Sequence, residues 1–292
     1  MRSNPAEYDL VDPGSLQAVV SLLAKEPGRW LPIAGGTDVM VQYAAGKLSA
    51  RKLVSIWNLP ELRRIEVLND EIQIGAVCTY TNLCEHRTLS AEFPLLASAA
   101  RWTGSVANQN RGTLGGNIVN ASPAADSLPA LLVYEADLLL VSVRGERRIP
   151  YLNFHTGYKK MQLASDELIR AVCLRRQFSK YFPYTRKVGA RNAQAIAKVC
   201  MAALGHLVGN TVADVRIALG SIAPVPLRLL KTEQLIKGKP IDPLLLISAK
   251  ETAVGEIQPI NDIRSTAAYR TGVVGNLVAE FLEKLRASGK QT

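Results

Sequence analysis

The chain has 292 residues, of which 48% are hydrophobic and 21% charged, and it carries a net charge of +10. That length and those fractions of hydrophobic and charged residues are ordinary for a globular protein of about two domains. No apolar run is long enough to span a bilayer, and no basic segment followed by an apolar one is visible at residues 1–4, so we expect neither a membrane span nor a signal peptide. We expect a cytoplasmic protein.

The residues that most often bind metals are dispersed. No two cysteines form a C-x-x-C pair, so the signatures of zinc ribbons and iron–sulfur sites are missing, and we expect reduced thiols in the core. The histidines also lack the spacing of metal ligands, which favours structural roles. These residues are Cys78, Cys84, Cys173 and Cys200, and His86, His155 and His206.

The positive charge is concentrated in one block. Residues 144–198 contain 13 Lys and Arg against 3 Asp and Glu, and the rest of the chain is balanced at 22 against 22. Such a block could bind nucleic acid, an anionic cofactor or an acidic partner protein, or it could be a solvated face. Nucleic acid is the least favoured of these, because the block contains no nucleic-acid-binding motif.

In chain order, the first half of the sequence mixes helices with short strands. Apolar spacing and capping residues predict helices, and period-two alternation around turn residues predicts strands. The predicted helices are 15–24, 39–44, one opening at Thr81, and 94–102; the predicted strands are 30–33, 52–56, and the hairpin 64–68 with 71–75.

The second half is predicted to contain more strands and two longer helices. A hairpin joins 138–143 to 147–149, a further strand covers 168–174, and a domain boundary is expected near 177–183. Beyond it we predict strands at 184–190, 199–208 and 212–219, and helices at 242–254 and 265–287, the last with an apolar stripe. Hairpins and helices mixed in this way predict an α+β fold.

Two Gly-Gly turns are the most informative motifs, Ala34-Gly35-Gly36-Thr37-Asp38 and Thr113-Leu114-Gly115-Gly116-Asn117. Glycine reaches positive φ at low cost and lets the backbone approach a ligand, while consecutive N–H groups can form an anion nest. Thr37 or Asp38 could cap the helix that follows the first turn. Neither turn matches G-x-G-x-x-G or a P-loop. Two such turns almost eighty residues apart predict two walls around one dinucleotide.

At this point the sequence resembles the FAD-binding medium subunits of the molybdenum hydroxylases, the family of xanthine and carbon monoxide dehydrogenases. Besides the first turn, the resemblance rests on segments in family order over nearly the whole chain. They are Gln109-Asn110-Arg111-Gly112-Thr113-Leu114-Gly115-Gly116-Asn117, Ala121-Ser122-Pro123-Ala124-Ala125-Asp126, Asp166-Glu167-Leu168-Ile169 and Ser265-Thr266-Ala267-Ala268-Tyr269-Arg270.

The resemblance implies a fold and a domain division. Residues 1–177 would form an FAD-binding domain of the vanillyl-alcohol-oxidase (PCMH) type, with lobes at about 1–57 and 58–177. Residues 178–292 would form the smaller C-terminal domain of carbon monoxide dehydrogenase flavoproteins. FAD would lie extended between the lobes, with its pyrophosphate between the two glycine turns.

The resemblance also implies roles for individual residues. The adenosine and pyrophosphate would lie against Leu31, Pro32, Ile33, Ala34, Gly35, Gly36, Thr37 and Asp38. The opposite wall would be Thr113, Leu114, Gly115, Gly116 and Asn117, with Leu168 and Ile169 near the adenine. Asp126 would accept a hydrogen bond from a cofactor hydroxyl, and Lys187 would lie near the edge of the isoalloxazine, where a cation stabilises the charge of reduced flavin.

Two positions depart from the family pattern. Gln109 stands where relatives often have Arg, and Ala195 stands where they often have Asp or Tyr near the flavin face. The second departure leaves the electron acceptor and its access route open. The four dispersed cysteines also imply that this chain lacks the cysteine-rich loop with an extra iron–sulfur cluster that some relatives carry.

The function implied is that of an oxidoreductase subunit without a catalytic acid, base or nucleophile of its own. A large subunit with molybdopterin would hydroxylate a purine or an aldehyde, and a small subunit with [2Fe-2S] clusters would deliver electrons to FAD. FAD would pass them to NAD or another acceptor, in a dimer of heterotrimers. Two alternatives remain: a self-contained flavoenzyme, for which His155 and Tyr158 are candidate residues, and a non-enzymatic basic binding module.

Overall fold

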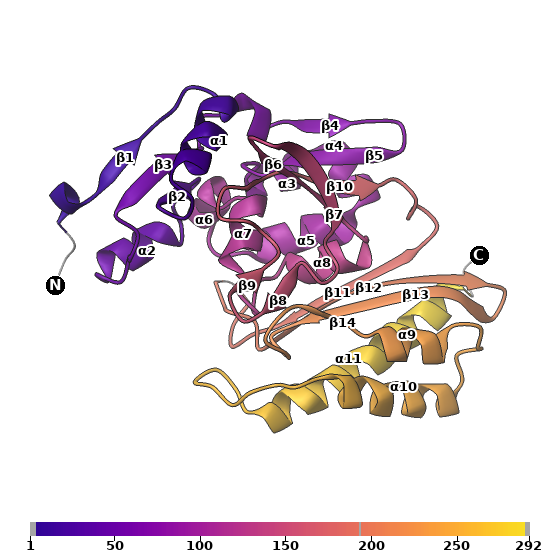
Figure 1. Ribbon diagram of the computed structural model, residues 1–292. Helices are drawn as coiled ribbons and strands as arrows, with labels where there is room; N and C mark the ends of the chain where they lie inside the picture. The colour runs from indigo at the N-terminus through magenta and orange to yellow at the C-terminus, as the bar shows by residue number, and fades with distance from the viewer. Residues whose placement is uncertain (1–3, 193, 290–292) are drawn as a thin grey trace.

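The computed structural model describes residues 4–192 and 194–289. The three larger of the four sheets in the described residues define an N-terminal lobe, a central lobe and a C-terminal layer (Figure 1). The helices and strands predicted in each half of the sequence are confirmed, so the fold is α+β. The helix expected from Thr81 begins at Tyr80, because Thr79 caps it.

The N-terminal lobe is a parallel sheet of three strands in the order β1-β3-β2 with two helices. Ser15 accepts a hydrogen bond from the N–H of Ala18, which fixes the start of the first helix, and Val19, Val20 and Leu23 bury its apolar face. The elements are η1 (Pro5–Glu7), β1 (Asp9–Val11), α1 (Leu16–Lys25), β2 (Trp30–Ile33), α2 (Val39–Ala44), β3 (Lys52–Ser55) and η2 (Pro60–Leu62).

The central lobe is an antiparallel sheet in the order β4-β5-β10-β6-β7, covered by short helices. Its strands are β4 (Ile65–Val67), β5 (Glu71–Gly75), β6 (Asp137–Ser142), β7 (Gly145–Pro150) and β10 (Leu168–Arg175), with the small hairpin β8 (His155–Gly157) and β9 (Lys160–Met161). Its helices are α3 (Tyr80–Glu85), α4 (Arg87–Glu92), α5 (Pro94–Trp102), α6 (Val106–Arg111), α7 (Leu114–Asn120) and α8 (Leu128–Val133). Of these helices, α4, α6, α7 and α8 were not predicted.

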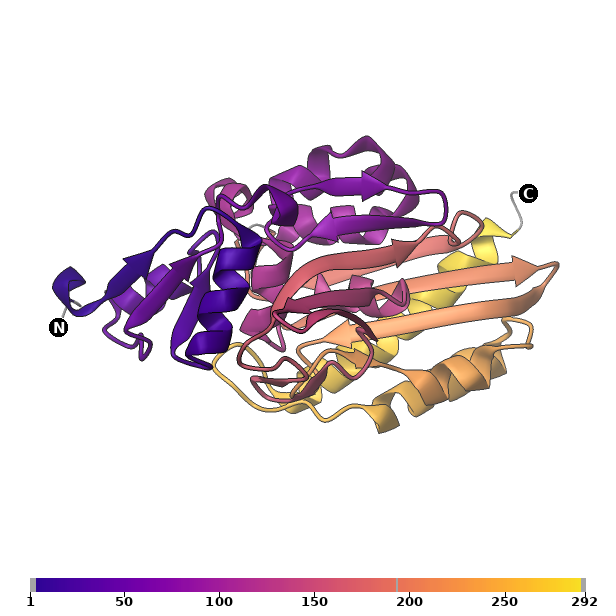
Figure 2. The same cartoon turned by 45° about the horizontal axis from the view of Figure 1, so that its top comes forward.

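The C-terminal layer is an antiparallel sheet in the order β11-β12-β13-β14, backed by three helices. Its elements are β11 (Phe182–Val188), β12 (Val199–Val208), β13 (Thr211–Gly220), β14 (Leu227–Arg228), α9 (Leu230–Ile236), α10 (Pro243–Glu256) and α11 (Ala267–Ser288). Figure 2 shows α11, in yellow, running behind the long strands β12 and β13. The predicted apolar stripe of α11, from Val274 to Leu285, is buried against this sheet.

The C-terminal sheet is buried on both faces. Successive side chains of a strand point to opposite sides, and in β12 Met201 and Ala203 pack with α11, whereas Ala202 and Leu204 join the core of the central lobe. Helices α5 and α8 cover that second face. The C-terminal layer therefore fixes the position of the segments around α8.

Candidate functional site

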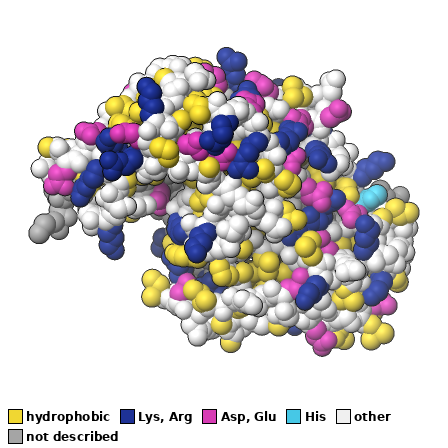
Figure 3. All heavy atoms as spheres, in the orientation of Figure 1, with side chains coloured by type: hydrophobic (Ala, Val, Ile, Leu, Met, Phe, Trp, Pro, Cys, Tyr) yellow, Lys and Arg dark blue, Asp and Glu magenta, His cyan; other side chains and the backbone are white. Residues whose placement is uncertain are grey.

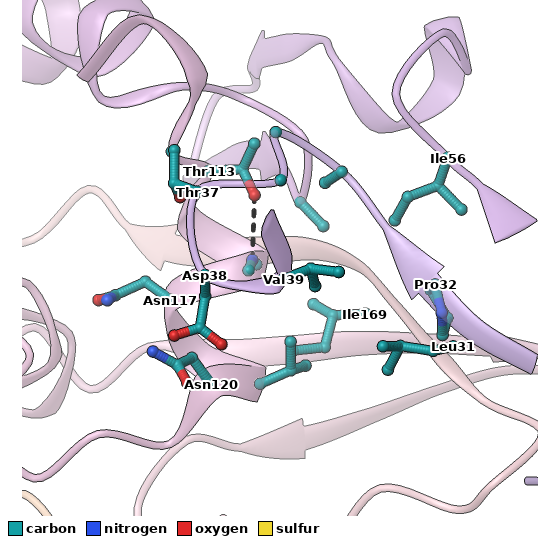
Figure 4. A pocket seen from close by; sticks show the side chains of 18 of the residues that line it. Leu31, Pro32, Thr37, Asp38, Val39, Ile56, Thr113, Asn117, Asn120 and Ile169 are labelled. Carbon is teal, nitrogen blue, oxygen red and sulfur yellow. Dashed lines mark hydrogen bonds between the residues drawn. The ribbon is translucent and has the colours of Figure 1, made fainter. Parts of the chain in front are cut away.

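A cavity of about 790 Å³ lies between the N-terminal and central lobes, and both glycine turns line it. Its size is within the range of cofactor pockets. Figure 4 shows its polar side chains, Asp38, Asn117 and Asn120, on one side, and the apolar Leu31, Pro32, Ile56 and Ile169 on the other. A ligand with one polar and one apolar part fits this division.

The first glycine turn, between β2 and α2, presents backbone donors. Gly36 has a φ of +77°, which favours glycine, and Asp38 precedes α2 as its N-cap residue but makes no capping hydrogen bond with its side chain. For the N–H groups of residues 35–38, no acceptor within the described chain is recorded. Residues 35–37 are half-buried, and N–H groups without partners there call for an external acceptor, such as the oxygens of a phosphate.

The second glycine turn differs, because the N–H groups of residues 114–117 already have partners. Thr113 Oγ1 accepts from the N–H of Gly116 at 3.1 Å and thereby caps α7, and the N–H of Gly115 donates to Ala76 at 2.8 Å. The N–H groups of Leu114 and Asn117 donate to Cys78 and Thr113. This wall therefore offers the open face of Gly116 and the Asn117 amide, whereas the free N–H groups belong to the first turn.

The two turns touch each other. A side chain on Gly35 would place its Cβ 1.5 Å from the carbonyl oxygen of Arg111, so only glycine permits this approach. Arg111 Nε in turn donates to the Gly35 carbonyl at 3.3 Å, and its guanidinium stacks 3.9 Å from the centre of the Trp57 ring. The prediction of two walls around one space thus has a structural basis in this contact.

The start of β10 forms a third wall. Leu168 and Ile169 line the cavity, together with Glu167. The Glu167 side chain is only 5% exposed, and Arg147 holds it through two hydrogen bonds of 2.7 Å. Hydrogen bonding to Arg147 lowers the pKa of Glu167. The carboxylate therefore stays charged and paired instead of acting as an acid or a base in the cavity.

Most of the residues predicted at the site lie together on the cavity wall. They are Leu31, Pro32, Ala34, Gly35, Gly36, Thr37, Asp38, Thr113, Gly115, Gly116, Asn117, Leu168 and Ile169. Four others are not on the wall: Leu114 is buried in the core of the central lobe, Ile33 is half-buried in β2, and Asp126 and Lys187 pair with each other.

Asp126 and Lys187 form a buried ion pair at the joint between the central lobe and β11. Lys187 Nζ lies 2.6 Å from Asp126 Oδ2 and also donates to the Trp102 carbonyl at 2.8 Å. The side chains are 9% and 12% exposed, and Asp126 Oδ1 has no hydrogen-bond partner among the described residues. Burial outweighs the attraction of Lys187 and raises the pKa of Asp126 from 3.8 to about 6.

The sequence did not identify every residue on the wall. Asn120 follows Asn117 by one helical turn, a spacing that would have placed both on one face had α7 been predicted. Tyr80, Thr103 and Asn108 reach the cavity only through packing between distant segments. Lys159 Nζ binds the backbone and side-chain oxygens of Asn120 and so covers the end of α7.

With this geometry in view, the chain was compared with known proteins. The model of the FAD binding domain in molybdopterin dehydrogenase matches residues 6–174, more than half of the chain, and that of the CO dehydrogenase flavoprotein C-terminal domain matches residues 184–285. The xanthine dehydrogenase FAD-binding subunit of Escherichia coli O157:H7 is 31% identical over 278 residues, 94% of this chain and 95% of that protein.

The chain belongs to the FAD-binding subunits of the molybdenum hydroxylase family. A second relative, the glyceraldehyde dehydrogenase medium chain of Sulfolobus acidocaldarius, is 27% identical over 96% of this chain and 99% of its own. Among solved structures, the carbon monoxide dehydrogenase of Hydrogenophaga pseudoflava has a chain that superposes with a TM-score of 0.92 at 26% identity, covering 96% of this chain and 98% of its own. The predicted fold class and family are thereby confirmed.

The residues considered for a self-contained flavoenzyme do not face the cavity of this molybdenum hydroxylase subunit. His155 is buried, and its Nε2 lies 2.8 Å from the Ile118 carbonyl while its Nδ1 lies 3.3 Å from the Tyr151 hydroxyl. Burial lowers its pKa. Tyr158 is 65% exposed and is not on the cavity wall. Both are better explained as structural or surface residues.

The basic block of the subunit is largely neutralised by ion pairs. Of its 13 Lys and Arg residues, seven pair with acidic side chains in the described structure: Arg144, Arg147, Arg148, Arg170, Arg175, Arg176 and Lys187. Figure 3 shows basic and acidic side chains interspersed over the visible face. More than half of the block is therefore already paired, which weakens the hypothesis of a polyanion-binding module.

The described residues of the subunit contain neither a cluster of metal ligands nor a membrane-spanning helix. Across residues 4–192 and 194–289, no cluster of three or more His, Cys, Asp or Glu side chains is arranged to hold a metal ion. All four cysteines are free thiols, three of them buried. None of the helices in the described part of the chain has the length and apolarity to cross a membrane.

Proposed function

We propose that this FAD-binding subunit transfers electrons from the [2Fe-2S] clusters of a partner subunit to NAD or another acceptor. The observation that carries the proposal is the cavity between the two glycine turns, with free N–H groups on residues 35–38 and polar side chains on the facing helix. Bound FAD would supply a carrier that accepts and releases an electron pair. The chain itself binds and orients the cofactor and excludes water from it.

Different residues along the cavity would bind different parts of FAD. Residues 31–38 would hold the adenosine and the pyrophosphate, facing Thr113, Gly116 and Asn117. Leu168 and Ile169 would pack against the adenine. Asp126 and Lys187 do not line the cavity, so their proposed roles rest on the family resemblance. Asp126 would accept a hydrogen bond from a cofactor hydroxyl, and the Lys187 cation near the isoalloxazine edge would favour the reduced cofactor.

Substrate chemistry would take place in other subunits. Relatives named as medium chains imply larger and smaller partners, which we propose to be a molybdopterin-binding large subunit and a [2Fe-2S] small subunit in a cytoplasmic dimer of heterotrimers. The substrate would be a purine or an aldehyde, as the relatives named for xanthine and glyceraldehyde suggest. We also propose domains at 1–177 and 178–292, which the ranges of the two family models support.

The first test is the visible absorption spectrum of the purified chain, with chemical identification of any released cofactor. We expect a flavin spectrum and release of FAD, and co-purification would then identify the partners. A folded, colourless chain that also fails to bind added FAD would contradict the proposal. Turnover of a substrate by the chain alone would instead support a self-contained flavoenzyme.

The assignment of the second wall is tested by Gly116→Val. A Cβ at Gly116 would lie 2.7 Å from the Thr113 hydroxyl, so that side chain would have to rotate away, but no other atom outside the neighbouring residues and the backbone of the helix lies within 4 Å. We therefore expect the variant to fold but to lose FAD, because the branched side chain would occupy the cavity. A folded variant with normal flavin content would refute the placement of the phosphates beside Gly116.

A further inference from the structure

The segment of residues 121–126 links the second glycine turn to the C-terminal sheet. It follows α7 directly, beginning at Ala121, whose φ is +48°, and ending at Asp126. Two residues into the segment, the carbonyl of Pro123 accepts a hydrogen bond of 2.7 Å from the N–H of Ser221. Ser221 comes directly after β13. A backbone hydrogen bond therefore ties the C-terminal sheet to the end of the helix that lines the cavity.

Ser221 is held in a backbone conformation that serine rarely adopts. Its φ is +68° and it is 6% exposed. Besides the bond to Pro123, its Oγ donates to the Ala197 carbonyl at 3.0 Å, and its own carbonyl accepts from Arg270 Nη1 at 2.7 Å. Three hydrogen bonds to three distant segments thus maintain one strained residue, and strain of this kind points to a functional constraint.

The packing around Ser221 leaves little room for movement. A Cβ on the preceding residue, Gly220, would lie 2.6 Å from Cys200 Sγ and 3.2 Å from the Pro123 carbonyl oxygen. Arg270 is 3% exposed and also binds Asp262 at 2.6 Å, so the group that holds the Ser221 carbonyl is itself fixed. Close-packed contacts transmit displacement, so a shift of residue 221 would move Pro123.

We propose that Ser221 is a positioning residue through which the C-terminal sheet holds α7, and with it the second wall of the cofactor cavity. Ser221 acts through Pro123 and does not touch the cofactor. Lys187 of the same sheet binds Asp126 at the other end of the segment, so the sheet holds residues 121–126 at two points. The identity of the ligand, FAD, rests on the proposed function, whereas the mechanical link does not.

The test compares Ser221→Val with Ser221→Gly. Valine is β-branched and disfavours positive φ, so the N–H would turn away from Pro123, and we expect the Kd for FAD to rise about tenfold or more. Glycine accepts the same φ and keeps both backbone hydrogen bonds, so its Kd should stay within about twofold of the unmodified protein. If Ser221 only filled space, the smaller glycine would leave a gap, and its Kd for FAD would not stay near that of the unmodified protein.

Glu135→Gln is the matched control. Glu135 makes a second joint with the same sheet, pairing with Arg216 at 3.2 Å and with Arg228 at 3.0 Å, but it is not on the cavity wall. We expect this variant to lower the melting temperature and leave the Kd unchanged. The proposal is overturned if Ser221→Val also changes only the melting temperature.

A second readout needs no cofactor. In the ligand-free protein, amide hydrogen exchange of residues 114–121 should be faster in Ser221→Val by about tenfold and unchanged in Ser221→Gly and Glu135→Gln. This measurement decides the question even if the unmodified chain binds no FAD, an outcome that would refute the proposed function alone. If the valine variant does not fold, Ser221→Ala takes its place. Alanine loses the Ala197 bond, as glycine does, but positive φ remains unfavourable for it, so we expect changes of about threefold in the alanine variant only. No change in either readout overturns the proposal.

Discussion

At the scale of single residues, the Asp126–Lys187 pair shows burial and charge acting in opposite directions. The 2.6 Å contact with Lys187 favours the carboxylate, yet burial raises the pKa of Asp126 to about 6. Asp126 Oδ1 has no partner in the described structure, so half of the carboxylate loses its hydration without compensation. Burial therefore has the larger effect.

The raised pKa predicts how stability depends on pH. A carboxyl whose pKa is higher in the folded state than its ordinary 3.8 contributes stability below about pH 4, and loses it as the pH rises through about 6. The contribution is at most about 3 kcal/mol. We therefore compare the melting temperatures of the ligand-free protein and of Asp126→Asn. The advantage of the unmodified chain over the variant should be larger at pH 4.5 than at pH 7.5. A difference that is constant or grows with pH would mean that Asp126 stays ionised.

Gly35 allows a second prediction for a single residue. Because a Cβ there would overlap the Arg111 carbonyl oxygen, Gly35→Ala must separate the two glycine turns. We expect a loss of about 1–3 kcal/mol in the free energy of unfolding, together with weaker FAD binding, measured by denaturant titration and by flavin fluorescence. Gly255→Ala, at an exposed position of α10 with open space around it, is the control and should gain about 0.5–1 kcal/mol.

How much of the site could be predicted at this scale depends on where each signal lies in the chain. Gly35 and Gly36 stand out in the sequence because a local turn requires them. Ser221 does not, since its strained φ comes from partners that are 98, 24 and 49 residues away. The same applies to Tyr80, which lines the cavity because α3 packs beside α6.

At the scale of elements, α7 shows why the second glycine turn was predicted as a turn and not as a helix. Two glycines in seven residues lower helix propensity by about 1 kcal/mol each relative to alanine. The helix forms because Thr113 caps it and because Leu114 and Ile118 are fully buried. Tertiary packing thus overrides the local preference, and propensity alone does not reveal it.

The cap of α7 gives a prediction for this element. Thr113→Val keeps the shape of the side chain but removes the oxygen that accepts from the Gly116 N–H. We expect a loss of about 1 kcal/mol, or about 2 °C in melting temperature, and a lower affinity for FAD. Thr113→Ser retains the oxygen and should bind FAD nearly as well as the unmodified chain. Equal FAD affinity in the valine and serine variants would show that the cap does not shape the cavity wall.

At the scale of the whole molecule, the domain boundary expected from the sequence does not coincide with a boundary between hydrophobic cores. The expected boundary near residues 177–183 falls where the topology changes from the central sheet to the C-terminal sheet. The cores do not separate there, because Ala202, Leu204 and Ala218 belong to the same buried cluster as α8. These strands were predicted, but both faces of residues 199–204 are apolar, so the sequence does not show which neighbour covers each face.

A fragment of residues 1–177 is therefore predicted to fold poorly on its own. Without the C-terminal sheet, the apolar side chains of α5 and α8 that face β11, β12 and β13 would be exposed to water. Lys187 and Ser221 would also no longer hold Asp126 and Pro123. We expect the fragment to aggregate or to lack a cooperative thermal transition by circular dichroism, and to bind no FAD. A cooperatively folding fragment that binds FAD would mean that the two cores are independent, and that the C-terminal sheet contributes nothing to the cavity it supports.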